Sequence, residues 1–153
     1  MSHHKVKTAY LRDIYDLDAR RRTFAWVCRE LEKRRTKFDT IAFRGSSGHI
    51  AFAAALALDL PCVHVRKELG HSWIRCEGIL GERVAIVDDF VASGDTVEVI
   101  MEHLQAAAEK ERTPAPRLTH LFCYSRAGSQ ERGRAAVNAA NPGVVWIERA
   151  WEL

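Results

Sequence analysis

The stretch VAIVDDFVASGDTV, from Val84 to Val97, holds the side chains best suited to chemistry. Four apolar residues lead into two adjacent acids, Asp88 and Asp89, and a run of small or hydroxylated residues follows. Such a loop before a helix turns several backbone N–H groups toward one anion, and the helix N-terminus adds partial positive charge. The carboxylates can accept hydrogen bonds from a sugar diol or lie near a Mg²⁺ ion held by the ligand. Two acids beside an anion-binding loop would repel a ligand that is only an anion. We therefore predict a ribose phosphate, which brings hydroxyl groups for the acids and a phosphate for the loop.

The simplest alternative is an ordinary strand-to-helix turn capped by Asp95 or Thr96. Three other motifs share an apolar strand that ends in acids, but each lacks its context here. A P-loop ATPase needs G-x-x-x-x-G-K-[ST], and RGSSGH at residues 44–49 supplies no such lysine. A dinucleotide fold needs G-x-G-x-x-G near the first strand, which is absent. A receiver-type phosphoacceptor domain would place its acid pair near the start of the chain, so all three are disfavoured.

Hydrophobic periodicity predicts an alternation of helices and strands. A first helix, capped by Asp16 or Asp18, has an apolar face made of Phe24, Val27, Cys28 and Leu31. Further helices are predicted at residues 49–58, 95–111 and 131–140, and strands at residues 40–45, 62–65, 83–89, 118–125 and 144–149. The strand at 83–89 is mostly apolar, as a parallel strand covered on both faces should be. The order predicts an α/β fold with a five-stranded, mainly parallel sheet flanked by helices.

Polar residues follow three of these predicted strands. Arg44 to Gly48 follow the first, Arg66 and Lys67 the second, and the acid pair the third. In an open parallel sheet, ligands bind outside the carboxyl ends of the strands. Polar loops are common after strands, but three such ends together favour a binding site.

The whole chain, 153 residues with 47% hydrophobic and 28% charged residues, is expected to form one domain, residues 1–153. No long apolar run or signal-like segment occurs, so we expect a soluble, cytoplasmic protein without a membrane partner. Basic residues exceed acidic ones by 23 − 20 = 3, and the basic runs ARRRTF and EKRRTK read as solvated helix surface, so no nucleic acid is expected. The four cysteines lack C-x-x-C spacing and are expected to be reduced thiols, mostly buried.

The segment VAIVDDFVASGDTV resembles the phosphoribosyl pyrophosphate (PRPP) signature of the type I phosphoribosyltransferases: an apolar strand, two acids, three variable positions, Ser or Thr, Gly, any residue, Thr. Upstream, IAFRGSSGHIAFAAALALDLPCVHVRK is similar to the pyrophosphate loop, helix, strand and Arg-Lys pair of adenine-type members. The resemblance covers residues 39–100. It implies Mg²⁺-dependent transfer of ribose 5-phosphate from PRPP to a nucleobase nitrogen with release of pyrophosphate, a small hood built from the termini, and a homodimer.

The resemblance also implies roles for individual residues. Asp88 and Asp89 would contact the ribose hydroxyls and lie at the metal, and Lys67 would reach the pyrophosphate; these three are the candidate catalytic residues. The candidate substrate-binding residues are Arg44, Gly45, Ser46, Ser47 and Gly48 of the pyrophosphate loop, Arg66 beside Lys67, and Ala92, Ser93, Gly94, Asp95 and Thr96 around the 5-phosphate. No covalent nucleophile is required, because positioned charges stabilise an oxocarbenium-like transition state.

Two departures from the family pattern bear on the substrate. The 6-oxopurine enzymes carry an Asp at the position of Ala92, so an adenine-like base or a pyrimidine is favoured. The segment between the Arg-Lys pair and the acid strand, residues 68–83, is short for the lid of this family, which would leave more water at the site. Within it, Glu77 is interpreted as a surface charge in preference to a base-directed carboxylate.

The base pocket is the least defined part of the predicted site. Candidate aromatic residues are Tyr10, Tyr15, Trp146 and Trp151, each Trp being more typical of plain packing. A non-catalytic domain that binds PRPP or a nucleotide is the main alternative function. A hydrolase or kinase-like Mg²⁺ enzyme is a weaker one, because no nucleophile and base pair is visible.

Overall fold

The computed structural model describes residues 16–67, 75–125 and 130–150. Its helices are α2 (Leu17–Lys33), α3 (Gly48–Leu58), α4 (Asp95–Glu111) and α5 (Glu131–Ala140), with two short 3-10 helices, η1 (Arg35–Lys37) and η2 (Gly45–Ser47). Its strands are β1 (Thr40–Arg44), β2 (Cys62–Val65), β3 (Cys76–Gly78), β4 (Arg83–Asp88), β5 (Arg117–Cys123) and β6 (Val145–Glu148). The predicted α/β alternation is confirmed. The candidates Tyr10, Tyr15 and Trp151 lie outside the described residues.

The strands form one six-stranded sheet in the order β3-β2-β1-β4-β5-β6. Every neighbouring pair is parallel except β2 and β3, which are antiparallel. The prediction of five strands was therefore one short. The additional strand, β3, lies inside the segment that was expected to be a loop, and its residue Gly78 pairs with Val63. Gly78 has φ +131° and approaches the Cys62 carbonyl so closely that a Cβ would lie 2.1 Å from that oxygen.

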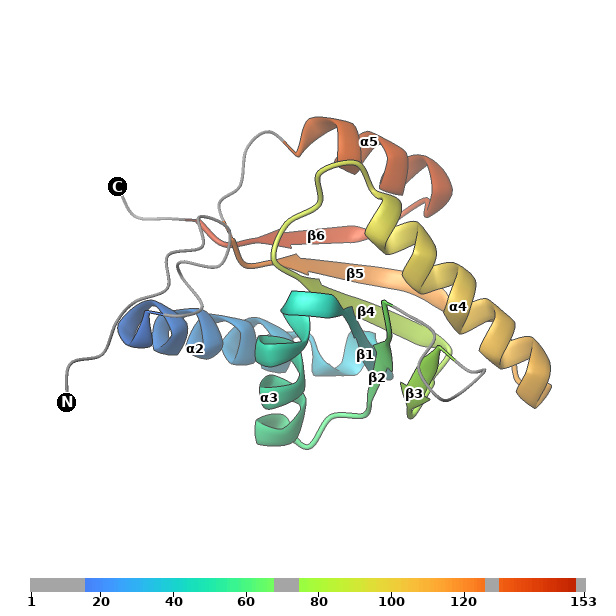
Figure 1. The fold of residues 1–153 in the computed structure, drawn as a ribbon, viewed down its shortest axis with the longest axis horizontal. Helices are drawn as coiled ribbons and strands as arrows, with labels where there is room; N and C mark the ends of the chain where they lie inside the picture. Colours follow the sequence, from blue (N-terminus) through green and yellow to red (C-terminus); the bar gives the residue numbers. More distant parts are fainter. Residues whose placement is uncertain (1–15, 68–74, 126–129, 151–153) are drawn as a thin grey trace.

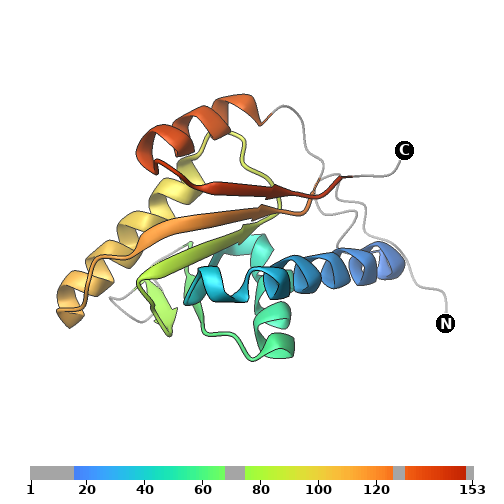
Figure 2. The same ribbon diagram turned by 180° about the vertical axis from the view of Figure 1, so that it is seen from behind.

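Helices cover both faces of the sheet (Figure 1). On one face, Val27 and Leu31 of α2 and Ile50 of α3 pack in one buried cluster with sheet residues, whereas Ile100 and Leu104 of α4 belong to the cluster on the other face. Figure 2 shows α2 and the sheet from behind. Successive residues of β4 alternate between these clusters, as the period of two of a strand requires. The predicted burial of this strand on both faces is confirmed, because Val84 to Val87 are 0% exposed.

Local signals explain where several elements begin and end. The Asp16 side chain caps α2 by accepting a hydrogen bond from the Ala19 N–H at 3.0 Å, so Asp16 rather than Asp18 is the N-cap. Helix α3 ends at Leu58, its C-cap Asp59 adopts φ 50°, and Pro61 then leads into β2. The four cysteines form no disulfide; Cys123 is buried and the other three are half-buried. Among the described residues, no helix has the length and apolar character needed to cross a membrane.

Candidate functional site

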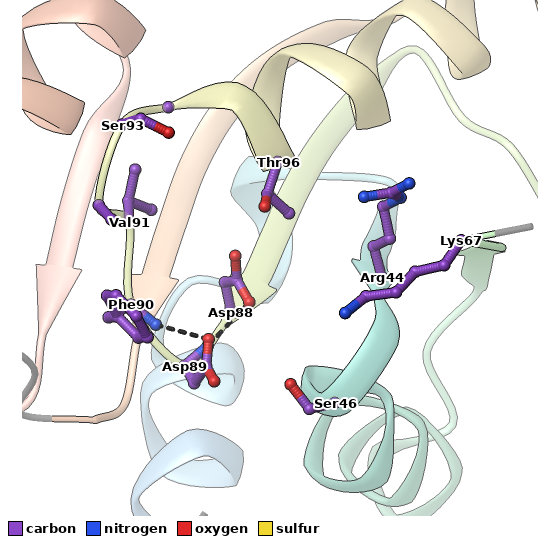
Figure 3. A pocket seen from close by; sticks show the side chains of 11 residues that line it. Arg44, Ser46, Lys67, Asp88, Asp89, Phe90, Val91, Ser93 and Thr96 are labelled. Atoms are coloured by element: carbon purple, nitrogen blue, oxygen red, sulfur yellow. Dashed lines mark hydrogen bonds between the residues drawn. The ribbon is translucent and has the colours of Figure 1, made fainter. Parts of the chain in front are cut away.

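A pocket of about 140 Å³ lies at the carboxyl ends of β1, β2 and β4. This is the edge at which an open parallel sheet places its ligand site. Figure 3 shows the pocket with Asp88 and Asp89 between the loop that carries Val91 and Ser93 and the opposite wall with Arg44 and Ser46. Thr96 lies at the start of α4. The residues that line it are Arg44, Ser46, Lys67, Asp88, Asp89, Phe90, Val91, Ala92, Ser93, Gly94 and Thr96.

The acid pair is buried at the end of β4. Asp88 is 5% exposed and Asp89 is 7% exposed. The Asp88 Oδ1 atom accepts the Asp89 N–H at 2.9 Å, and the Asp89 Oδ1 atom accepts the Phe90 N–H at 2.9 Å. Burial and the negative charge of Asp89 raise the pKa of Asp88 well above its usual value. The pair is therefore unfavourable by itself and suits a ligand that brings hydroxyl donors or positive charge.

The loop after the acids is shaped by a glycine and by contacts with α5. Gly94 adopts φ +98° immediately before α4 begins, a conformation that other residues rarely accept. The Val91 N–H donates a hydrogen bond to Gln130 Oε1 at 3.0 Å. A Cβ on Gly133 would lie 2.6 Å from the Val91 carbonyl oxygen and 3.0 Å from that of Ala92. The loop thus lies directly on α5, and it leads into the N-terminus of α4, an end of a helix that favours anions.

The opposite wall of the pocket is basic. Gly45 adopts φ +65°, and a Cβ there would lie 2.3 Å from Lys67 Cε, so the glycine lets the lysine cross the turn between β1 and α3. The buried Ser47 hydroxyl donates to the Arg44 carbonyl oxygen at 2.8 Å and holds this turn closed. Arg44 and Lys67 consequently present positive charge across the pocket from the acid pair.

Nine of the residues proposed from the sequence line the pocket together: Arg44, Ser46, Lys67, Asp88, Asp89, Ala92, Ser93, Gly94 and Thr96. Five others do not line it: Gly45, Ser47, Gly48, Arg66 and Asp95. Gly45 and Ser47 shape the turn, Gly48 starts α3, and Asp95 is exposed in the first turn of α4. The Arg66 Nη2 atom instead lies 2.8 Å from Glu77 Oε1, and the Glu77 side chain is 60% exposed. This agrees with the interpretation of Glu77 as a surface charge.

The sequence interpretation did not single out Phe90 and Val91, which line the pocket, or Gln130 and Gly133, which support its loop. Phe90 and Val91 occupy variable positions of the signature, so their types carried no signal. Gly133 did carry a signal, because a glycine inside a helical pattern often marks a close approach by another segment of the chain. Trp146 is absent from the pocket lining; its Nε1–H donates to Asn138 Oδ1 at 2.8 Å, and the Arg134 guanidinium lies over its ring.

No family model and no curated protein matches this chain. Solved structures do match it. An orotate phosphoribosyltransferase from Aeropyrum pernix is 17% identical with a TM-score of 0.64, over 93% of this chain and 76% of that one. An adenine phosphoribosyltransferase from Saccharomyces cerevisiae, solved with an imino-altritol bisphosphate and adenine, is 21% identical with a TM-score of 0.57, over 87% and 79%.

A third structure is the orotate phosphoribosyltransferase of Mycobacterium tuberculosis in complex with PRPP. It is 14% identical with a TM-score of 0.53, over 84% of this chain and 72% of that one. The strand order, the position of the pocket and these three likenesses agree with one another. The chain has the fold of the type I phosphoribosyltransferases.

Proposed function

We propose that the protein transfers ribose 5-phosphate from PRPP to a nitrogen of a nucleobase and releases pyrophosphate. The observation that carries this proposal is the composition of one pocket. The buried pair Asp88 and Asp89 stands between an anion-binding loop on one side and Arg44 with Lys67 on the other. A sugar that bears a phosphate at one end and a pyrophosphate at the other matches that order of charges. The likeness to a structure that holds PRPP supports it.

In the proposed reaction a bond forms between the base nitrogen and C1 of the ribose, and the bond from C1 to the pyrophosphate oxygen breaks. The nitrogen loses its proton, and the bonding electrons leave with pyrophosphate. The loop from Ala92 to Thr96 holds the 5-phosphate, and the acid pair accepts hydrogen bonds from the ribose hydroxyls. Arg44 and Lys67 balance the charge that develops on pyrophosphate, while the nearby carboxylates stabilise the positive charge on the sugar.

Mg²⁺ fits this donor set as an ion carried by the substrate. Two adjacent carboxylates, Asp88 and Asp89, face the pocket, and the described residues include no group of three or more His, Cys, Asp or Glu that could hold a metal. Mg²⁺ commonly keeps several waters and binds one or two carboxylates together with substrate phosphates. Bound in this way, it would neutralise charge on the pyrophosphate. The acids would hold it directly or through water.

The base is proposed to be adenine-like or a pyrimidine. Ala92 stands in the pocket lining where the 6-oxopurine enzymes carry an acid, which disfavours bases that need that carboxylate. The structures that match this chain include enzymes named for orotate and for adenine. Homodimer formation and a cytoplasmic location, both expected from the sequence, remain parts of this proposal.

One observation favours a second candidate, a non-catalytic domain that binds PRPP or a nucleotide. Strand β3 takes Cys76 to Gly78 out of the already short segment 68–83 and adds them to the sheet. Less chain then remains to cover the pocket, and a site open to water is a poor place for an oxocarbenium-like transition state. Such a domain would bind PRPP without turnover.

The test is pyrophosphate release from PRPP and Mg²⁺, measured with each nucleobase in turn and with none. The Asp88→Asn/Asp89→Asn variant should lose base-dependent release. A matched control is Asp18→Asn/Asp59→Asn, which removes the same charge from two exposed acids. Release that needs one base, is lost in the first variant and persists in the second supports the transferase and names its substrate. Thermal stabilisation by PRPP without release for any base would favour the binding domain instead.

A further inference from the structure

Arg75 lies beside the basic wall of the pocket. Its carbonyl oxygen accepts a hydrogen bond from the Arg66 N–H at 2.8 Å, and the next residue after Arg66 is Lys67, which lines the pocket. The Arg75 Nη1 atom lies 3.3 Å from Nε2 of His103 on α4. Arg75 is therefore tied to the sheet by its backbone and to α4 by its side chain.

His103 lies on the same side of α4 as Thr96. Thr96, which lines the pocket, precedes it by seven residues, a spacing that returns to the same face of a helix about 10 Å further along. Burial, then the positive charges of Arg75 and Arg44, lower the pKa of His103, and Glu102 has a smaller opposite effect. The imidazole is therefore neutral near neutral pH and accepts the Arg75 N–H when its own proton is on Nδ1.

The positive charges of Arg44 and Lys67, which line the pocket, and of Arg75, which does not, have no acidic partner in the described part of the chain. No described Asp or Glu forms an ion pair with Arg44, Lys67 or Arg75, in contrast to Arg66, which pairs with Glu77. The Nε atom of Arg44 is buried and finds no hydrogen-bond acceptor among the described residues. Gathering like charges without a counterion is unfavourable, so the arrangement suits a ligand with several negative charges.

We propose that Arg75, positioned by His103, forms with Arg44 and Lys67 the subsite for the pyrophosphate group of PRPP. This inference rests on the proposed function and adds two residues to it. Arg75 would contact the phosphate oxygens, and His103 is a positioning residue that acts through Arg75. The backbone hydrogen bond between Arg75 and Arg66 would hold this positive charge in a fixed place beside the leaving group.

The first experiment compares two ligands that differ in the pyrophosphate alone. Calorimetry measures binding of PRPP with Mg²⁺ and of ribose 5-phosphate to the wild type, to Arg75→Gln and to the control Arg117→Gln. Arg117 is an exposed arginine at the amino end of β5, the opposite edge of the sheet. We expect Arg75→Gln to weaken PRPP binding by about tenfold and to leave ribose 5-phosphate binding unchanged. The control should leave both unchanged.

The second experiment separates positioning from general structure. In His103→Leu the acceptor for Arg75 is lost, and PRPP binding should weaken several-fold while ribose 5-phosphate binding stays constant. In His103→Gln the amide oxygen can accept the Arg75 N–H, so most of the PRPP affinity should return. Equal weakening of both ligands by His103→Leu, or no rescue by His103→Gln, would overturn the positioning role.

The outcomes distinguish this inference from the proposed function. A wild type that binds PRPP, together with an Arg75→Gln variant that binds it equally well, overturns the subsite and leaves the transferase proposal standing. Loss of ribose 5-phosphate binding in Arg75→Gln would show that Arg75 maintains the whole pocket, which also overturns the subsite. A wild type that binds neither ligand overturns the proposed function and the subsite together.

Discussion

At the scale of single residues, Asp88 shows a conflict between stability and the proposed activity. Its carboxylate is buried next to Asp89, and both burial and that neighbouring charge favour its neutral form. The hydrogen bond that its Oδ1 atom accepts from the Asp89 N–H could be accepted equally well by an amide oxygen. The negative charge of Asp88 therefore opposes folding, and we attribute its presence to the ligand.

We predict that Asp88→Asn stabilises the ligand-free protein and removes most of the activity. Removing a buried like-charge contact is expected to raise the melting temperature by about 2–4 °C. Base-dependent pyrophosphate release should fall by about 10²-fold, because an amide supplies no negative charge to the sugar. Thermal melts at about pH 8 without PRPP, and initial rates with it, measure the two effects. Asp18→Asn should change neither value, and a lower melting temperature for Asp88→Asn would contradict the argument.

At the scale of elements, the anion-binding loop depends on α5. The Val91 N–H of the loop donates a hydrogen bond to Gln130 Oε1, and Gly133 leaves room for the carbonyl oxygens of Val91 and Ala92. Gly94 approaches the same helix, since a Cβ on Gly94 would lie 3.2 Å from Ala136 Cβ. Contacts with α5 thus determine the position of the loop at the end of β4.

We predict that Gly133→Ala weakens binding of ribose 5-phosphate although alanine is the better helix former. Alanine would favour α5 by about 1 kcal/mol, but its Cβ would collide with backbone oxygens of the loop. The reverse change on the exposed face, Ala139→Gly, should lower the melting temperature and leave ribose 5-phosphate binding intact. Calorimetry and thermal melts of both variants test this. Tighter or equal binding by Gly133→Ala would show that the loop does not depend on this contact.

The elements also show what a sequence can predict. Helix α4 and strand β2 were predicted with their observed bounds, because local sequence signals mark where each begins. Hydroxylated residues and a glycine precede α4, and Pro61 precedes the apolar run of β2. Strand β3 had no such signal. Cys76, Glu77 and Gly78 show no strand pattern, and they become a strand because they pair with the edge of β2.

The site likewise has parts that local sequence predicts and parts that only the folded structure reveals. Acids, hydroxyl groups and glycine lie within one continuous stretch, so Asp88 to Thr96 could be proposed from spacing alone. The support from Gln130 crosses a sequence separation of 39 residues, and the contact of Arg75 with His103 crosses 28. Pairs so far apart in sequence depend on the packed sheet and helices. A single sequence gives no indication of them.

At the scale of the whole molecule, the two ends of the parallel strands differ in function. The carboxyl ends form the pocket, and at the amino ends an ion pair joins the starts of β1 and β4. There the Arg83 Nη2 atom donates to Asp39 Oδ1 at 2.6 Å, and the Arg83 N–H donates to Asp39 Oδ2 at 2.9 Å. In return, the Asp39 N–H donates to the Arg83 carbonyl oxygen at 2.7 Å. This clamp should serve stability and leave ligand binding to the carboxyl ends.

Asp39→Asn should test that separation through its dependence on pH. Hydrogen bonds from Arg83, followed by its positive charge, hold the pKa of Asp39 below its usual value. A lowered folded-state pKa stabilises the protein above the unfolded pKa of about 3.9, and the stabilisation disappears as pH falls through the folded value. We therefore expect Asp39→Asn to lower the melting temperature by about 2–4 °C at about pH 7 and by progressively less below about pH 4. PRPP affinity at neutral pH should not change. A difference in melting temperature that persists undiminished in acid would mean that the Asp39 charge is not its source, and a loss of PRPP affinity would mean that the two ends of the strands are coupled.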